Sequence, residues 1–166
     1  PEFVEHASGI GHIHMVPDGD GVQRGVDLLI RNQSDIIPAL SLIAGTPHED
    51  TAGTSPFLEG RTLRFDKLLV DVDTDSHWLP RFYAPRLANW PFRAASASDV
   101  LEGRTPADKF NGKIVLVGVT SPTIEPPLAT PVAAAMPAAT VVAHQISSIL
   151  QRDWLSRPAW ASILEG

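Results

Sequence analysis

The sequence predicts an α/β fold, built as a single domain with one mixed β-sheet and about three packed helices. Short apolar runs between turn residues indicate strands at residues 62–65 and 68–72, and a helical apolar stripe indicates a helix at residues 140–151. Residues 113–118, Lys-Ile-Val-Leu-Val-Gly, are apolar at nearly every position and rich in β-branched side chains. Because such a run fits a strand buried on both faces, we expect it at the centre of the sheet.

The first part of the chain predicts a β-hairpin. Residues 11–16 alternate between polar and apolar side chains, which is typical of a strand. Residues 17–21 are rich in Asp and Gly and suit a turn, so that residues 22–30 form the return strand.

A helix is expected next, at residues 35–44. Asp35 can cap it, Pro38 is tolerated in its first turn, and Gly45 can end it. The polar residues 46–56, with their Gly and Pro, then predict an exposed loop.

Past the strands of residues 62–72, a turn at residues 73–76 and a return strand at residues 78–83 are expected. Ser96 is placed to open a short helix that runs through Leu101. Asp99 stands three residues after Ser96, which is the spacing of a capping box.

The strongest helix signal covers residues 140–151. Four apolar residues share one face of that helix: Val142, Ile146, Ile149 and Leu150. His144 lies beside this stripe and could titrate near neutral pH. A histidine in such a place is more often partly buried with its hydrogen bonds satisfied, and that is the structure we expect.

The composition excludes several classes of function. The net charge is −6 and no basic stripe is visible, which argues against a nucleic-acid partner. The absence of cysteine excludes disulfides and thiol chemistry. No apolar run reaches the roughly 18–20 residues of a membrane span. No phosphate-binding or dinucleotide motif is present, and we expect no cofactor.

Both ends of the chain resemble cut ends. Residues 1–3, Pro-Glu-Phe, fit a cloning remnant, and we expect the domain to cover residues 4–160. Residues 161–166 fit the start of a clipped membrane-proximal segment or a tag. Aromatic and basic residues of the kind found at membrane surfaces precede them: Trp154, Arg157 and Trp160. Ordinary packing of a C-terminal tail is the alternative.

Two histidines form the metal-site candidate. His12 and His14 alternate on the expected strand, so both imidazoles face one side, where they could share a transition metal. No third ligand is fixed by spacing, and a pair of strand histidines without metal is the alternative. Asp18 and Asp20 imitate the start of a calcium loop, but Val22 fills the third acidic position, so a hairpin turn fits better.

The loop after the expected central strand, residues 119–130, is the first place to look for a small ligand. In open α/β sheets, ligands commonly lie beyond the carboxyl ends of buried strands. A structural role for the prolines of this loop is the alternative. Thr120 and Ser121 could also be imagined as nucleophiles beside Glu125, but no spacing supplies a base.

Four ordered segments carry a family resemblance. Residues 11–24, GHIHMVPDGDGVQR, resemble the G-H-I-N-x-x-P-D-x-D-G-V-x-R segment of the second type of CHASE domain, an extracellular sensory module associated with cyclases and histidine kinases. Residues 110–122, FNGKIVLVGVTSP, are similar to its F-x-G-K-I-V-L-I-G-A-T-A-P segment. Later matches continue in order, at residues 129–131, at residues 136–143 and at residues 157–160, so the resemblance spans residues 6–160.

The departures from the family pattern fall on polar positions. Glu125 and Pro126 stand where the family usually has Gly-Asp. In the segment that matches P-G-V-E-I-H-A, Thr140 replaces the acidic residue and Val142 replaces the histidine. The earlier half of the family's domain has no counterpart, so the chain resembles its later part or a shortened version.

The resemblance implies a non-catalytic extracytoplasmic module of a bacterial transmembrane receptor, membrane-proximal and homodimeric in its parent. Its output would be a nucleotide cyclase, a histidine kinase or a serine/threonine kinase elsewhere in that chain. We expect it to bind an unknown small molecule through these candidate contacts: Thr120, Ser121, Glu125, Thr130 and Thr140. A structural or dimerisation module without a small ligand is the first alternative, and a hydrolase is the second.

Overall fold

The computed structural model describes residues 5–33, 35–46, 55–84 and 91–156. Its elements are β1 (Val26–Asp27), β2 (Leu29–Asn32), β3 (Asp35–Pro38), α2 (Leu40–Gly45), β4 (Phe57–Glu59), β5 (Thr62–Phe65), β6 (Leu68–Asp71), β7 (His77–Trp78), α3 (Ala97–Leu101), the 3₁₀ helix η1 (Ala107–Phe110), β8 (Leu128–Thr130), β9 (Ala133–Met136) and α4 (Ala138–Gln151). Three α-helices and a set of strands within the described ranges confirm the predicted α/β class.

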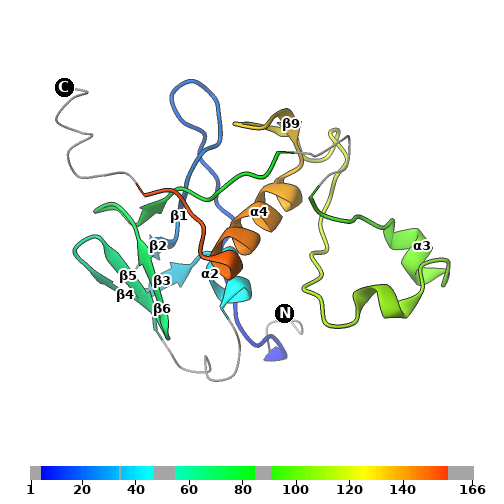
Figure 1. Cartoon of the computed structure of the whole chain (residues 1–166), viewed down its shortest axis with the longest axis horizontal. Helices are drawn as coiled ribbons and strands as arrows, with labels where there is room; N and C mark the ends of the chain where they lie inside the picture. The colour runs from blue at the N-terminus through cyan, green and yellow to red at the C-terminus, as the bar shows by residue number, and fades with distance from the viewer. Residues whose placement is uncertain (1–4, 34, 47–54, 85–90, 157–166) are drawn as a thin grey trace.

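The strands of the described residues form four small antiparallel sheets rather than one central sheet (Figure 1). Strands β4, β5 and β6 form a meander, while β1 pairs with β7, β2 with β3 and β8 with β9. Two isolated parallel bridges join further segments: His12 with Ala39, and Val22 with Ala129 of β8. The backbone pairing is therefore mixed: the named strand pairs are antiparallel, and these two isolated bridges are parallel.

Helix α4 packs against α2, and both helices border the hydrophobic core. Eleven buried side chains make up this core: Val26, Leu28, Ala39, Leu42, Leu63, Phe65, Leu68, Val70, Val72, Trp78 and Ile149. A Cβ atom on Gly45 would lie 2.8 Å from Cγ2 of Ile149. The missing side chain of Gly45 therefore permits the close approach of α2 to α4. We call residues 22–33, 35–46, 55–84 and 128–156 the body.

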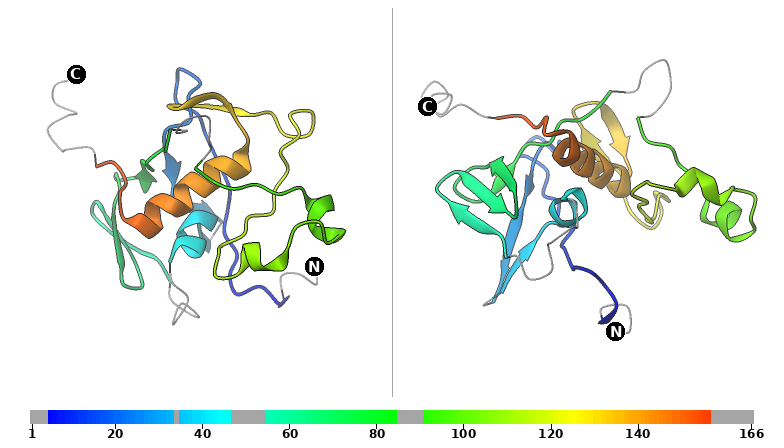
Figure 2. Two further views of the ribbon diagram at one scale, coloured as in Figure 1. Left: turned by 45° about the vertical axis from the view of Figure 1, so that its right-hand side comes forward. Right: turned by 60° about the horizontal axis from the view of Figure 1, so that its bottom comes forward.

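Residues 91–125, which we call the arm, extend away from the body (Figure 2). Helix α3 and the 3₁₀ helix η1 have no buried residue, and Leu101 of α3 is 86 % exposed. The arm contacts α4 at Phe92 and at Gly118. The ring of Phe92 lies against His144, and a Cβ atom on Gly118 would lie 2.6 Å from Cβ of Ala139.

The predicted central strand, residues 113–118, is absent, and this prediction was wrong. The segment belongs to no strand, and most of its residues are exposed, with Val117 at 92 %. Among the described residues, no strand lies beside it to accept or donate a ladder of hydrogen bonds. Its composition suits a buried strand, but composition does not supply the neighbours that a sheet requires.

The predictions for the first 45 residues also need correction. Residues 11–16 form no strand and contribute only the bridge at His12, so the expected hairpin does not form. The predicted helix of residues 35–44 begins only at Leu40. Residues 35–38 instead form β3, because pairing with β2 satisfies their backbone in a local hairpin. The turn predicted at residues 17–21 is confirmed, since the Gly21 amide donates to the carbonyl of Asp18 at 2.8 Å.

Several local predictions are confirmed. Strands β5 and β6 lie where expected, and the turn after them is held by the Asp73 side chain, whose Oδ1 accepts from the amides of Asp75 and His77. Helices α3 and α4 match their predicted ranges within two residues. The capping box at Ser96 does not form, because its hydroxyl bonds to that of Ser98. Leu150, predicted on the buried stripe, is half exposed.

Candidate functional site

The predicted loop site, residues 119–130, contains a turn at residues 121–125, and the predicted threonine contacts after it belong to backbone structure. Thr120 is exposed, and the carbonyl of Ser121 accepts from the amides of Ile124 at 3.1 Å and Glu125 at 3.0 Å. This turn folds Glu125 back over Ser121. Within the described residues, neither the Thr120 hydroxyl nor that of Ser121 bonds to a base, which removes support for the hydrolase alternative.

The other two predicted contacts serve the backbone. Thr130 is buried, and its Oγ1 bonds to both the carbonyl and the amide of Ala133, closing the β8–β9 turn. Thr140 lies half buried in the first turn of α4, where its amide donates to the Pro137 carbonyl at 2.8 Å. A ligand role for these threonines and for the loop stays a prediction.

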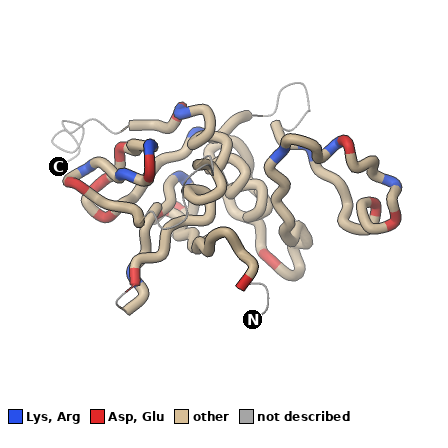
Figure 3. The backbone as a smooth tube through the Cα atoms, turned by 90° about the horizontal axis from the view of Figure 1, so that it is seen from below, with Lys and Arg blue, Asp and Glu red and all other residues tan. Residues whose placement is uncertain are grey.

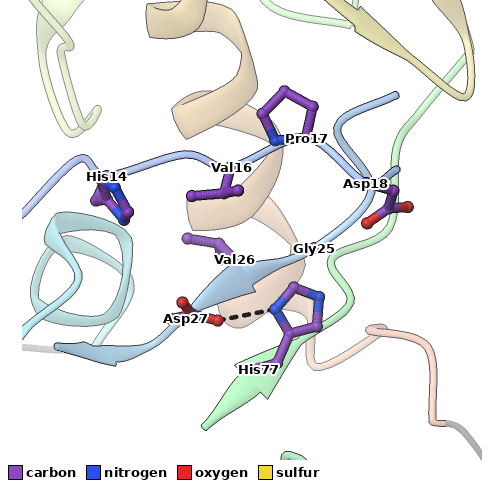
Figure 4. A pocket seen from close by; sticks show the side chains of 8 residues that line it. All are labelled: His14, Val16, Pro17, Asp18, Gly25, Val26, Asp27 and His77. Carbon is purple, nitrogen blue, oxygen red and sulfur yellow. Dashed lines mark hydrogen bonds and ion pairs between the residues drawn. The ribbon is translucent and has the colours of Figure 1, made fainter. Parts of the chain in front are cut away.

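A cavity of about 260 Å³ lies elsewhere, between the N-terminal segment, β1 and β7 (Figure 4). Its lining is His14, Val16, Pro17, Asp18, Gly25, Val26, Asp27 and His77. Polar and apolar groups share this lining, so a small molecule could make both hydrogen bonds and apolar contacts there. We call it the β1–β7 cleft.

The floor of the β1–β7 cleft carries a cross-strand pair. Oδ1 of Asp27 lies 2.8 Å from Nδ1 of His77, and the two residues are direct partners in the β1–β7 register. A Cβ atom on Gly25 would lie 2.0 Å from Nε2 of His77. Only glycine at position 25 therefore leaves room for the imidazole in this position.

An arginine is bonded to Asp18, one of the residues that line the β1–β7 cleft. The guanidinium of Arg24 contacts Oδ2 of Asp18 and Oδ2 of Asp20, each at 2.7 Å. These hydrogen bonds, with one from the Val22 amide, lower the pKa of Asp20 to about 2. They also raise the pKa of Arg24. The carboxylates of the calcium-like segment are thus committed to Arg24, in agreement with the turn that we predicted there.

The two N-terminal histidines lie close together. The His14 amide donates to Nδ1 of His12 at 3.2 Å, while Nε2 of His12 is buried without a hydrogen-bond partner. Burial, and then the charge of His14, lower the pKa of His12 against the opposing effect of Asp27. The described residues contain no group of three or more His, Asp or Glu side chains that could hold a metal ion. Metal binding by the two histidines stays a prediction.

Sequence reasoning missed the aromatic enclosure of His144. This residue is fully buried, Nδ1 accepts from the amide of Tyr83 at 3.1 Å, and Nε2 has no hydrogen-bond partner. The rings of Phe82, Tyr83 and Phe92 surround it at centroid distances of 5.3, 5.6 and 4.8 Å. Burial lowers the pKa of His144 to about 4. Its place beside the apolar stripe signalled burial, but the expectation that its hydrogen bonds are satisfied was wrong at Nε2. No local pattern signalled the rings.

Charged residues of both signs are spread along the described chain. Positions of Lys and Arg are interspersed with those of Asp and Glu (Figure 3). In the arm, Arg104 bonds to Asp99 and to Glu102, so that opposite charges pair locally.

Comparison with known proteins places the chain in a family. The family model described as CHASE2 domain matches residues 1–166, the whole chain. No curated protein and no solved structure matches it. In the part of the chain that the structure describes, no helix has the length and apolar character needed to cross a membrane. The chain belongs to the CHASE2 family of sensory extracellular domains, as its motifs had indicated.

Proposed function

We propose that this chain is the extracytoplasmic sensor of a bacterial transmembrane receptor, in which it binds a small polar molecule in the β1–β7 cleft. The family supports a sensory role outside the cytoplasm. The output domain of the parent chain is a cyclase or a kinase. Binding changes the position of the segment that follows α4, through which the signal leaves the domain.

The observation that carries this proposal is the double role of β7. His77 lines the β1–β7 cleft, while its neighbour Trp78 points into the core and is 1 % exposed. The ring of Trp78 packs edge-on against that of Trp154, three residues after α4, at a centroid distance of 6.3 Å. The amide of Leu155 donates to the Leu79 carbonyl at 2.9 Å. Three consecutive residues therefore connect the cleft to the chain that leaves α4.

The lining indicates the chemistry of the ligand. Asp27, whose Oδ1 contacts His77, brings a carboxylate to the β1–β7 cleft, and His14 adds an imidazole, beside the apolar surface of Val16 and Val26. The carboxylate of Asp18 is already bonded to Arg24. A small molecule with an amine or other hydrogen-bond donors and a short apolar part fits this lining. Such a ligand shifts β7 only through its different affinity for two arrangements of the β1–β7 pair.

A thermal-shift screen of small amines, amino acids and related metabolites tests the proposal. A ligand of the cleft should raise the Tm of the wild type and lose this effect in Asp27→Asn. Asp75→Asn, a change of the same chemistry in the exposed turn before β7, should keep the effect.

The predicted loop provides the competing location. If the shift persists in Asp27→Asn but disappears in a Thr120→Ala, Glu125→Ala double variant, the ligand binds at residues 119–130 and the cleft assignment is wrong. If no compound of this class stabilises the wild type, the proposal for the ligand fails. A structural or dimerisation module is then favoured, for which the exposed apolar residues 114–119 are the supporting observation.

A further inference from the structure

Residues 114–119 form an unpaired chain of strand-forming residues on the surface of the arm. Ile114, Val115 and Val117 are 51 %, 52 % and 92 % exposed. Within the described residues, no backbone amide or carbonyl of this segment bonds to another backbone group. β-Branched residues with free amides and carbonyls are a ready template for pairing with another strand.

One side of this segment packs against the body, and the other side is exposed. Gly118 lies against Ala139 in the first turn of α4, and Leu116 is half buried. Because side chains alternate along an extended chain, Leu116 and Gly118 share the side that faces the body. Val115, Val117 and Val119 share the opposite side, where all three are exposed.

We propose that two copies of this chain pair through residues 114–120, as antiparallel strands related by a two-fold axis at Val117. A two-fold axis brings the same residues from both copies together. The contact therefore needs no other partner, and the assembly stops at a dimer. The register that follows sets Val117 opposite Val117, Val115 opposite Val119, Leu116 opposite Gly118 and Ile114 opposite Thr120. Most of these cross-strand pairs join β-branched residues, which stabilise strand pairing.

Charge complementarity selects the antiparallel orientation. Lys113 precedes the strand, Glu125 follows it, and neither makes an ion pair within the described residues. In the proposed register Lys113 of one copy stands opposite Ser121 of the other. The backbone of Glu125 is hydrogen-bonded to that of Ser121, so Glu125 of one copy comes near Lys113 of the other. A parallel pair would instead set lysine beside lysine. Pro122 ends the ladder, because proline has no amide hydrogen to donate.

This contact differs from the proposed ligand site and does not depend on it. The axis at Val117 lies next to Gly118, which touches α4, so a dimer would bring the first turns of both α4 helices near one another. An interface at this place would let two sensors respond together.

The oligomeric state in solution tests the proposal. Sedimentation of the wild type without ligand, over a range of micromolar concentrations, should show a monomer–dimer equilibrium. Val117→Lys should weaken the dimer by on the order of 100-fold, because it sets two lysines opposite each other at the axis. The Tm of the monomer should not change, since Val117 is 92 % exposed in it. The matched control is Leu101→Lys, at a side chain of α3 that is 86 % exposed, and it should leave dimerisation unchanged.

A charge exchange tests the orientation. Lys113→Glu and Glu125→Lys should each weaken the dimer by about 3-fold, and the double variant should recover the wild-type affinity. Hydrogen exchange should show protection of the amides of residues 114–119 that grows with protein concentration.

Three results would overturn the proposal. They are a wild type that stays monomeric at several hundred micromolar, a Val117→Lys variant that dimerises normally, and concentration-independent protection of residues 114–119. If residues 114–119 are protected at every protein concentration in a longer, monomeric piece of the parent chain, the strand that pairs with them belongs to another segment of the same molecule. None of these readouts depends on a ligand, so they leave the thermal-shift test of the cleft unaffected.

Discussion

Two apolar runs of similar composition, residues 68–72 in the body and residues 115–119 in the arm, lie in opposite environments. Each carries three large apolar residues at alternate positions. Leu68, Val70 and Val72 are at most 6 % exposed, whereas the equivalent positions of the arm run from 43 % to 92 %. The alternation is the same, so the difference comes from what lies beside each run.

Strand β6 follows its partner β5 after a two-residue turn, and Phe65 pairs directly with Leu68. A hairpin of this kind closes at a small entropic cost and delivers its apolar face to the core. Residues 115–119 have no such neighbour in the sequence, and the described part of the chain supplies none from a distance. The comparison teaches that the composition of a segment sets its tendency to form a strand, while the presence of a neighbouring strand decides whether the segment is buried.

The largest contrast between the two regions should appear on truncation of a large side chain. Trp78→Ala should lower the free energy of unfolding by about 4 kcal/mol, because it empties a fully buried site in the core. Leu101→Ala in the arm should change it by less than about 0.5 kcal/mol. Urea denaturation of both variants checks this, and similar losses would show that α3 is more deeply packed than the structure indicates.

A smaller effect should appear where the two regions meet, at His144. Its pKa is lowered to about 4 in the folded state, so the unfolded chain takes up a proton first as the pH falls. The stability that a neutral His144 contributes is complete above its ordinary pKa of 6.5, and it decreases as the pH falls from 6.5 toward 4. Between pH 7 and pH 4.5 the loss should be about 2 kcal/mol.

The control for this prediction is His144→Gln, which removes the titrating group. The variant should be less stable at pH 7 but should lose less of its remaining stability on acidification. Equal slopes of unfolding free energy against pH in the two proteins would show that another group controls the acid response.

The parts of the fold that the sequence predicted are those with local causes. The β5–β6 hairpin, the Asp73 turn, α3 and α4 each depend on residues close together in the chain. The helix expected at residues 35–44 failed because pairing with β2 competes for its first residues, and turn and helix signals overlap there. The placement of residues 113–118 failed because burial is not a local property.

The candidate site shows the same limit. Sequence reasoning assigned His14 to an expected strand and Asp18 to the turn that follows it, and both line the β1–β7 cleft. It did not connect them to His77, which lies some sixty residues away and reaches the cleft only because β7 pairs with β1. The role of Gly25 was equally hidden, since its requirement comes from the ring of His77 rather than from its own backbone.

The smallest effect concerns how closely α2 and α4 approach within the body. A methyl group at position 45 would lie 2.8 Å from Cγ2 and 2.9 Å from Cβ of Ile149, both too short for an ordinary contact. Gly45→Ala adds helix propensity but must push the helices apart, and we expect a net loss of about 1 kcal/mol. Gly19→Ala, where no atom lies within 4 Å, should change stability by less than about 0.5 kcal/mol. Thermal unfolding separates the two cases. A Gly45→Ala protein as stable as the wild type would mean that α2 moves away from α4 at little cost, so that the body is less tightly packed than its buried side chains suggest.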